Sequence, residues 1–234
     1  METTRTDITP TTARRITITA WAMAAFGTVA GELHALARFN SHPGDLTEGL
    51  GAKWAPDAID ALRPLLDWSD PFFVYYTYGK IWLPICLAFV AAAWLVYRRR
   101  QPHGAERWAW RVQLAAYVLL TISVTGDYYT PWMEYFFIVG IVALPVMGFG
   151  GIWLGILLLR NGFRPRITPW LLIAFLPLFF AITTVTSMGN ALLPLMWGWA
   201  IAAHRVAQPT SPQLVSQQAA AAADFYNRDA VTRI

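Results

Sequence analysis

The feature that most constrains this chain is a series of apolar runs, each long enough to cross a membrane. An α-helix needs about 20 residues to span a hydrocarbon core of about 30 Å. Of the 234 residues, 56% are hydrophobic and only 14% are charged, whereas typical soluble domains carry about 25% charged residues. This composition excludes a water-soluble single domain and predicts an all-α, polytopic membrane helix bundle.

Six apolar segments predict six transmembrane helices. They cover residues 16–37, 72–97, 108–126, 135–159, 168–186 and 188–203. Three of them are preceded or opened by a polar residue, a proline and an aromatic residue, starting at Asp70, Thr130 and Thr168, which is typical of a capped helix start. The last segment is short for a full span, so a re-entrant or surface segment is the alternative there.

Basic residues collect at one end of these segments. They precede the first segment and occupy the links between the second and third and between the fourth and fifth. The members are Arg5, Arg14, Arg15, Arg98, Arg99, Arg100, Arg107, Arg111, Arg160, Arg164 and Arg166. Because short cytoplasmic loops carry the excess of positive charge, both termini are predicted to be cytoplasmic, in the plasma (inner) membrane.

The first segment also has features of a secretory signal, because Arg14 and Arg15 precede a stretch with small residues such as Ala22 and Ala24. The apolar run continues well beyond those small residues, which favours a retained membrane anchor.

The bundle is predicted to cover residues 16–205, including a long outer loop (39–70), and to lie between an N-terminal tail (1–15) and a C-terminal tail (206–234). The C-terminal tail is rich in Gln, Ser and Ala and is predicted to be flexible or partly helical. In the outer loop, apolar residues recur at helical spacing between Trp54 and Trp68, with acidic residues on the other face. These apolar residues are Ile59, Leu62, Leu65 and Leu66. The pattern predicts a short helix on the membrane surface, and a helix packed on other loops is the alternative.

Charged groups at membrane depth are the best candidates for function, since each costs about 2.5–3.5 kcal/mol to insert. At 1.5 Å per residue from the inner ends, Glu32 lies about 24 Å along the first segment and Lys80 about 25 Å along the second. We therefore expect these two side chains to meet near the outer boundary, which Asp127 and Glu134 mark on the next two segments. A structural ion pair without a functional role is the alternative interpretation.

Aromatic and amide side chains fall in the same outer layer. The predicted ligand-binding residues are Glu32, Tyr76, Tyr78, Lys80, Asp127, Tyr128, Glu134 and Asn190, and the candidate catalytic residues are Glu32, Asp127 and Lys80. Pro84 and Pro194 lie four residues after Lys80 and Asn190, so each should interrupt its helix and free a carbonyl. Ordinary membrane-interface residues would also explain the tyrosines and the two boundary acids.

Two glycine pairs at a spacing of four, Gly27 with Gly31 and Gly151 with Gly155, allow close helix packing. This spacing predicts contact between the first and fourth segments.

Several classes of chemistry find no support in the residues. The single cysteine, Cys86, excludes an internal disulfide, a CxxC pair and a cysteine zinc cluster. His34 shares a helical face with Arg38 and points away from Glu32, so these two do not form a metal site together. No haem-type histidine pair, phosphate loop, HExxH motif or nucleophile elbow is present. We expect no metal, no cofactor and no nucleic-acid partner.

Three functions then compete. The first is binding of a lipid headgroup or an amphipathic small molecule in the outer polar layer, alone or as an accessory subunit of a membrane assembly. The second is a membrane-embedded enzyme for a lipid-soluble substrate, with Glu32 or Asp127 as acid or base and Lys80 stabilising negative charge. A small transporter is disfavoured, because the inner halves of the segments carry few titratable groups and no repeat is visible. Expected partners are membrane lipids, a lipid-soluble ligand, and further copies or other membrane subunits.

Overall fold

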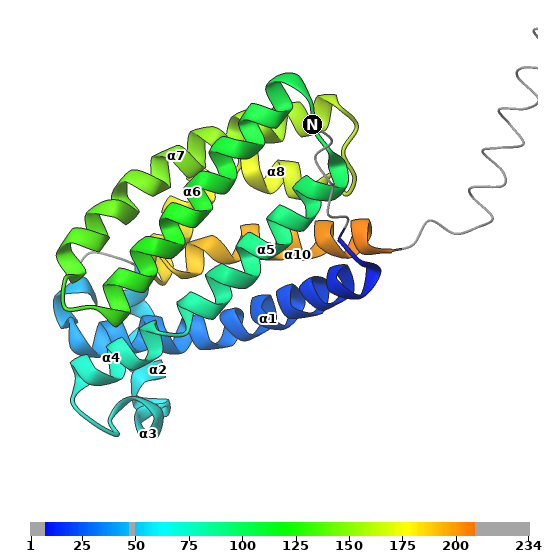
Figure 1. Ribbon diagram of the computed structural model, residues 1–234. Helices are drawn as coiled ribbons and strands as arrows, with labels where there is room; N and C mark the ends of the chain where they lie inside the picture. Colours follow the sequence, from blue (N-terminus) through cyan, green and yellow to red (C-terminus); the bar gives the residue numbers. More distant parts are fainter. Residues whose placement is uncertain (1–7, 47–49, 209–234) are drawn as a thin grey trace, which may run out of the picture.

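The computed structural model describes residues 8–46 and 50–208, which form a bundle of helices with no strand among them (Figure 1). The longer helices are α1 (Pro10–Ser41), α5 (Trp82–Arg100), α6 (Gly104–Tyr129), α7 (Met133–Arg160) and α10 (Leu193–Ala207). The shorter ones are η1 (Pro43–Leu46), η2 (Leu50–Lys53), α2 (Ala55–Ala61), α3 (Arg63–Leu66), α4 (Pro71–Gly79), α8 (Ile167–Ile173), α9 (Phe175–Val185) and η3 (Asn190–Leu192). The all-α prediction is confirmed.

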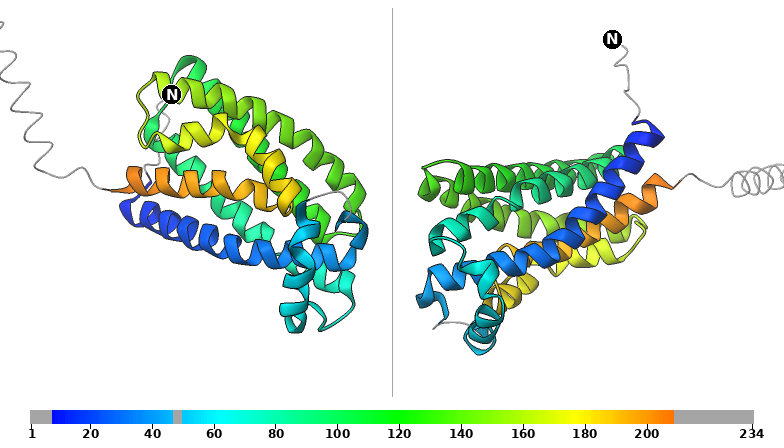
Figure 2. Two further views of the ribbon diagram at one scale, coloured as in Figure 1. Left: turned by 180° about the vertical axis from the view of Figure 1, so that it is seen from behind. Right: turned by 90° about the horizontal axis from the view of Figure 1, so that it is seen from below.

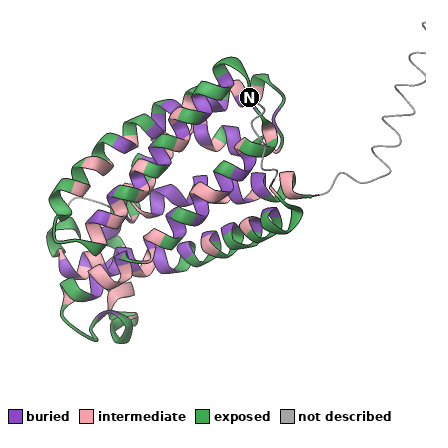
Figure 3. Ribbon diagram, in the orientation of Figure 1, coloured by how far each residue is buried: buried purple, intermediate pink, exposed green. Residues whose placement is uncertain are grey.

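Within the described residues, three helical stretches are long and apolar enough to cross a membrane. They are α1, the combined stretch Pro71–Arg100 formed by α4 and α5, and α7. The pair α8 and α9 passes the same test together but is bent by 73°. Many exposed side chains are large and apolar, including Phe149 (67% exposed) and Phe180 (67%), as expected for a surface that faces lipid (Figure 3). By length and composition these helices fit a membrane-embedded protein, and the count of six spans remains a prediction.

The helices run between two distinct ends of the bundle. The start of α1, the end of α10 and the turn between α5 and α6 lie at one end, which we call the arginine end because it holds Arg98, Arg99 and Arg100 (Figures 1 and 2). The helices α2 and α3 and the start of α4 lie at the opposite, loop-helix end (Figure 1). Both ends of the described chain therefore leave from the basic end of the bundle, and the cytoplasmic placement of the termini stays a prediction. The tail predictions for residues 1–7 and 209–234 lie outside the described residues.

Prolines explain where the apolar segments break. A proline lacks an N–H and clashes with the carbonyl four residues earlier. Pro177 lies four residues after Ile173, which is the last residue of α8, so the prediction of one continuous helix over 168–186 is wrong. Pro84 likewise follows the break between α4 and α5. Because Pro84 has no N–H to donate to the carbonyl of Lys80, that carbonyl can accept another hydrogen bond, and the Tyr129 hydroxyl donates to it at 3.1 Å.

The three predicted helix starts have different outcomes. Asp70 caps α4 as predicted, since its carboxylate accepts the N–H groups of Phe72 (3.0 Å) and Phe73 (3.3 Å). The other two are wrong. Thr130 instead ends α6, and its hydroxyl donates to the Gly126 carbonyl at 2.7 Å. Thr168 lies inside α8 and its hydroxyl donates to the Gly198 carbonyl at 2.7 Å, so it ties two helices together.

The predicted helix in the outer loop is present as α2 and α3, and it packs on the bundle. Leu66 of α3 is fully buried in a cluster with Leu36 and Phe39 of α1 and Val74 of α4. The Trp54 indole donates a hydrogen bond to the Val185 carbonyl at 2.9 Å. This packing on α1 and α4 is compatible with both interpretations of the loop helix, and its place at the membrane surface stays a prediction.

The two glycine pairs face different neighbours, so the predicted contact between them is wrong. A Cβ on Gly27 would lie 3.1 Å from Leu193 and 3.3 Å from Ile85, on α10 and α5. A Cβ on Gly155 would lie 2.7 Å from the Pro169 carbonyl of α8. The spacing did indicate close packing, but it does not specify the partner helix.

Candidate functional site

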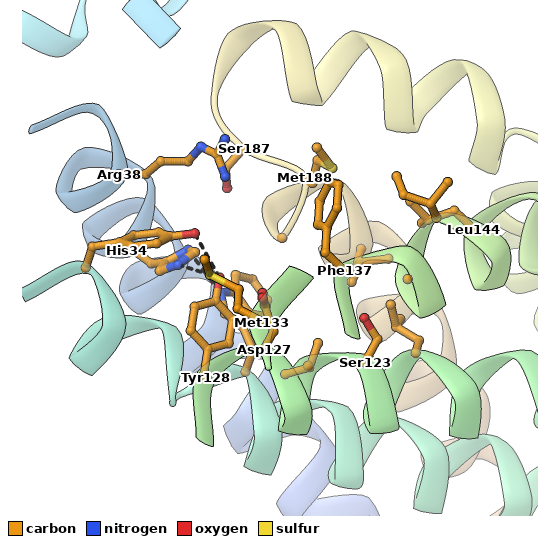
Figure 4. Close-up of a pocket in the computed structure, with 18 of the residues that line it drawn as sticks. His34, Arg38, Ser123, Asp127, Tyr128, Met133, Phe137, Leu144, Ser187 and Met188 are labelled. Carbon is orange, nitrogen blue, oxygen red and sulfur yellow. Dashed lines mark hydrogen bonds between the residues drawn. The ribbon is translucent and has the colours of Figure 1, made fainter. Parts of the chain in front are cut away.

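A cavity of about 510 Å³ lies at the loop-helix end, between α1, α6, α7 and the link that joins α9 to η3 (Figure 4). Its polar residues are His34, Arg38, His42, Tyr75, Tyr76, Ser123, Asp127, Tyr128, Glu134 and Ser187. Its apolar lining includes Leu120, Val124, Phe137, Ile138, Ile141, Leu144, Phe179 and Leu192. The cavity is thus amphipathic, and it is of the size that holds a small organic ligand.

One face of α1 supplies the basic groups of the cavity. His34, Arg38 and His42 follow one another at a spacing of four residues, which places them in one row along a helix. All three line the cavity. His34 is buried at 4% exposure, while the Arg38 side chain is 36% exposed and reaches toward the loop that ends α1.

His34 is held by a chain of hydrogen bonds whose direction can be assigned. The Trp82 indole nitrogen lies 3.1 Å from His34 Nδ1, and an indole N–H can only donate. His34 Nδ1 therefore carries no hydrogen, the ring is neutral, and its hydrogen sits on Nε2, which donates to the Tyr128 oxygen at 3.0 Å. The Tyr128 hydroxyl in turn lies 3.3 Å from that of Tyr75.

Aromatic packing fixes the same group of rings. His34 stacks on Tyr75 with ring centres 5.0 Å apart and meets Tyr128 edge-on at 5.5 Å. Glycines make room for two of these rings. A Cβ on Gly189 would lie 2.5 Å from the Trp82 ring, and one on Gly79 would overlap Tyr128. These glycines allow both rings to lie directly against neighbouring backbone, which orients them toward His34.

The charges around the cavity are only partly paired. Arg38 donates from Nε to the Asp45 carboxylate at 2.7 Å. Within the described part of the chain, the Asp127 carboxylate forms no hydrogen bond or ion pair. Asp127 lies just beyond the predicted span 108–126, and burial raises the pKa of its carboxyl to about 6, an effect that the nearby charge of Arg38 partly opposes. This acid can therefore change protonation state near neutral pH.

The structure brings together half of the residues predicted to bind a ligand. Tyr76, Asp127, Tyr128 and Glu134 line the cavity. The others do not, and their surroundings differ. Tyr78 donates to the Leu65 carbonyl at 2.9 Å.

The predicted ion pair between Glu32 and Lys80 is wrong. Glu32 accepts a hydrogen bond from the Asn190 amide at 2.8 Å. Lys80 is exposed at the break between α4 and α5, and its ammonium lies 5.9 Å from the centre of the Tyr129 ring. Helix rise predicts the depth of a residue, but the direction in which it points depends on how each helix is rotated about its axis, and the break rotates Lys80 away.

Sequence reasoning missed His34, Arg38 and His42 as a group. The available signal was the repeat of basic or imidazole side chains every fourth residue near the end of an apolar helix. Only a face that meets protein or a cavity accommodates such a row within a membrane. Among the residues that the structure describes, no three His, Cys, Asp or Glu side chains are grouped so as to hold a metal ion.

No protein family, no curated protein and no solved structure matches this chain. The chemistry of the cavity is therefore the basis for a functional hypothesis.

Proposed function

We propose that this protein binds an amphipathic, membrane-derived molecule in the cavity at its loop-helix end. The observation that carries the proposal is the separation of the lining into two parts. Arg38, Tyr75 and Ser187 give one part hydrogen-bonding groups, while the other is hydrocarbon from α6, α7 and α9. A molecule with a polar head and an apolar body matches both parts at once.

The position of the cavity supports a ligand that comes from the membrane. Ile138 and Ile141 of α7 line the cavity and are 60% and 49% exposed, so the cavity is open along this helix. The apolar part of the cavity therefore reaches the flank of the bundle where lipid is expected. A hydrophobic ligand could enter from the bilayer along this flank without passing through water.

The proposal can be tested by identifying what the protein retains on purification. The purified full chain is extracted with organic solvent and its small molecules are analysed by mass spectrometry. Leu144→Trp places a large ring inside the cavity and should reduce the retained ligand at least tenfold. Ile156→Trp is the matched control, because Ile156 lies on the same helix, is 45% exposed and does not line the cavity.

The two variants separate specific binding from general lipid carry-over. Specific binding predicts loss of one defined compound in the Leu144 variant and full retention in the Ile156 variant. Equal retention of every compound by wild type and both variants would contradict the proposal.

Asp127 favours a second candidate function, a membrane-embedded enzyme. Its carboxyl lines the cavity, has no partner among the described residues and has a pKa of about 6, which suits general acid or base catalysis. Incubation with extracted membrane lipids followed by mass spectrometry tests this function. Conversion of a lipid by wild type but not by Asp127→Asn would support catalysis, whereas an unchanged lipid profile would leave binding as the function.

A further inference from the structure

We propose that the ligand of this cavity is a single-chain lipid whose head carries a hydrogen-bond acceptor of the carbonyl or carboxylate type. This inference rests on the proposed binding function and specifies the ligand class. It follows from the number of hydrogen-bond donors that the polar end of the cavity presents, and from the space beyond them.

The first donor follows from counting hydrogens along the chain of bonds at His34. The bond between His34 and Tyr128 uses the hydrogen of His34, because Trp82 already donates to the other ring nitrogen. The bond between Tyr128 and Tyr75 uses one of the two hydroxyl hydrogens. One tyrosine hydrogen is therefore left without a partner among the described residues. Tyr75 and Tyr128 both line the cavity, so this hydrogen is available to a ligand whichever of the two hydroxyls carries it.

Arg38 and Ser187 add further donors at the same end. Arg38 uses Nε for Asp45, and the described residues provide no acceptor for its two terminal nitrogens. Ser187 is 7% exposed, and its oxygen accepts the backbone N–H of Asn190 at 3.5 Å, which leaves its own hydrogen free. Figure 4 shows Arg38 and Ser187 on the same side of the cavity. Three donor groups from three different elements thus surround one space.

A ligand that supplies acceptor oxygens can bond all three donors, of which Tyr75 and Ser187 are buried and Arg38 is partly exposed. The acids Asp127 and Glu134 would instead favour an ammonium head. Glu134, however, is exposed and Asp127 is half-buried, whereas the donors Tyr75 and Ser187 are buried at 6% and 7% exposure. The buried end of the cavity therefore favours an acceptor head.

The remaining space fits one hydrocarbon chain. Phe137, Leu144 and Phe179 continue the cavity away from the donors, within a total volume of about 510 Å³. Cavities of this size hold a single drug-sized ligand. A fatty carboxylate and an alkyl-substituted quinone share both the acceptor oxygen and the chain.

Direct binding measurements with three probes test the proposed class. Oleate, an alkyl benzoquinone and oleylamine are titrated against the full chain in lipid nanodiscs, and binding is followed by intrinsic tryptophan fluorescence, since Trp82 lies at the site. We expect oleate or the quinone to bind at least tenfold more tightly than oleylamine. Preferential binding of oleylamine would overturn the proposed head chemistry.

Two variants examine the donors themselves. Arg38→Gln should weaken oleate binding about tenfold or more, since a hydrogen bond to a charged group is worth at least about that factor. It should weaken quinone binding less, which distinguishes the two acceptor heads. Tyr75→Phe combined with Tyr128→Phe removes both hydroxyls and should weaken the preferred acceptor probe about threefold to tenfold. Asp45→Asn is the control, because it removes the partner of Arg38 outside the cavity and should leave acceptor binding no weaker.

Failure of this inference is distinguishable from failure of the proposed function. If Leu144→Trp abolishes binding of the probes but the Arg38 variant and the double tyrosine variant bind as wild type does, the cavity binds amphipathic molecules and the acceptor class is refuted. If none of the three probes binds to wild type, the proposed ligand class is refuted, and the proposed function is refuted as well only if the Leu144 variant retains every compound that wild type retains.

Discussion

Glu106 offers the sharpest test of how the arginine end is held together. Its carboxylate, near the start of α6, accepts hydrogen bonds from Arg100 through two nitrogens, from the Asn161 amide at 2.6 Å and from the Trp110 indole at 3.3 Å. Glu106 is 6% exposed. It therefore joins the turn between α5 and α6 to the end of α7, and Arg100 also donates to the Asn161 carbonyl at 3.3 Å.

Glu106→Gln keeps the shape of this side chain but removes its charge and one acceptor oxygen. Hydrogen bonds to a charged group contribute about 1.5–3 kcal/mol each. Two of the bonds from Arg100 and Asn161 should weaken or be lost, while Arg100, which is 22% exposed, can partly turn toward water. We expect a loss of about 3 kcal/mol in the free energy of unfolding, which corresponds to about 6–12 °C in melting temperature for a chain of this size.

The assay is thermal unfolding of the purified chain in detergent, followed by tryptophan fluorescence, with Glu134→Gln as the control. Glu134 is exposed, so its substitution should change the melting temperature little. A melting temperature for Glu106→Gln within about 2 °C of wild type would refute this account, because 1 kcal/mol is worth about 2–4 °C.

The same residue predicts a pH dependence. Glu106 lies outside the predicted span 108–126. Burial tends to raise the pKa of its carboxyl, but the hydrogen bonds from Arg100 and Asn161, the charge of Arg100 and the bond from Trp110 together lower this pKa below the ordinary value of 4.5. A lowered folded-state pKa gives stability that is present above pH about 4.5 and is lost as the pH falls through the folded value. As the pH falls below 5, wild type should lose the part of its unfolding free energy that the ionised Glu106 carboxylate contributes. Glu106→Gln lacks this carboxylate, so its melting temperature should fall less over the same pH range.

Two further predictions concern helix packing and orientation. Gly155→Ala should lower the melting temperature far more than Gly27→Ala, because the added Cβ meets the Pro169 carbonyl in the first case and the flexible end of Leu193 in the second. Equal effects would contradict this packing. If the loop-helix end faces the outside of the cell, a thiol reagent that cannot cross the membrane should label Asp57→Cys but not Gln101→Cys in intact cells. The native Cys86 is buried and should not react. Labelling of Gln101→Cys but not Asp57→Cys would show that the arginine end faces outward instead.

Apolar periodicity and charge distribution were sufficient to locate the helices. All six predicted segments coincide with helical regions, and the loop helix between Trp54 and Trp68 is present. These features depend on residues close together in the chain. The proline at position 84 also predicted a break correctly, because the clash that a proline causes is local. The bend before Pro177 is the same effect and could have been predicted in the same way.

Which side chains meet at the site depends on how each helix is rotated and on which helices are neighbours. Local sequence patterns do not show either of these. Rise per residue placed Glu32 and Lys80 at one depth, but helix rotation turned Glu32 to Asn190 and left Lys80 at the surface. The glycine pairs failed for the same reason, since a small residue shows that something lies close but not which helix it is. Tyr128 and Asp127 lie near the end of α6 and line the cavity, and their role in ligand binding stays a prediction.

The end of α6 explains why the polar part of the cavity is preorganised. Tyr128 and Tyr129 are consecutive and point to different neighbours. Tyr128 bonds His34 of α1, while Tyr129 bonds the carbonyl of Lys80 at the break between α4 and α5. Trp82, two residues after Lys80, donates to the other nitrogen of His34. The proline break thus supplies a carbonyl for one tyrosine and positions the indole that fixes the tautomer of His34. Because these bonds form within the protein, the donors at the cavity are oriented before a ligand arrives, which lowers the entropic cost of binding it.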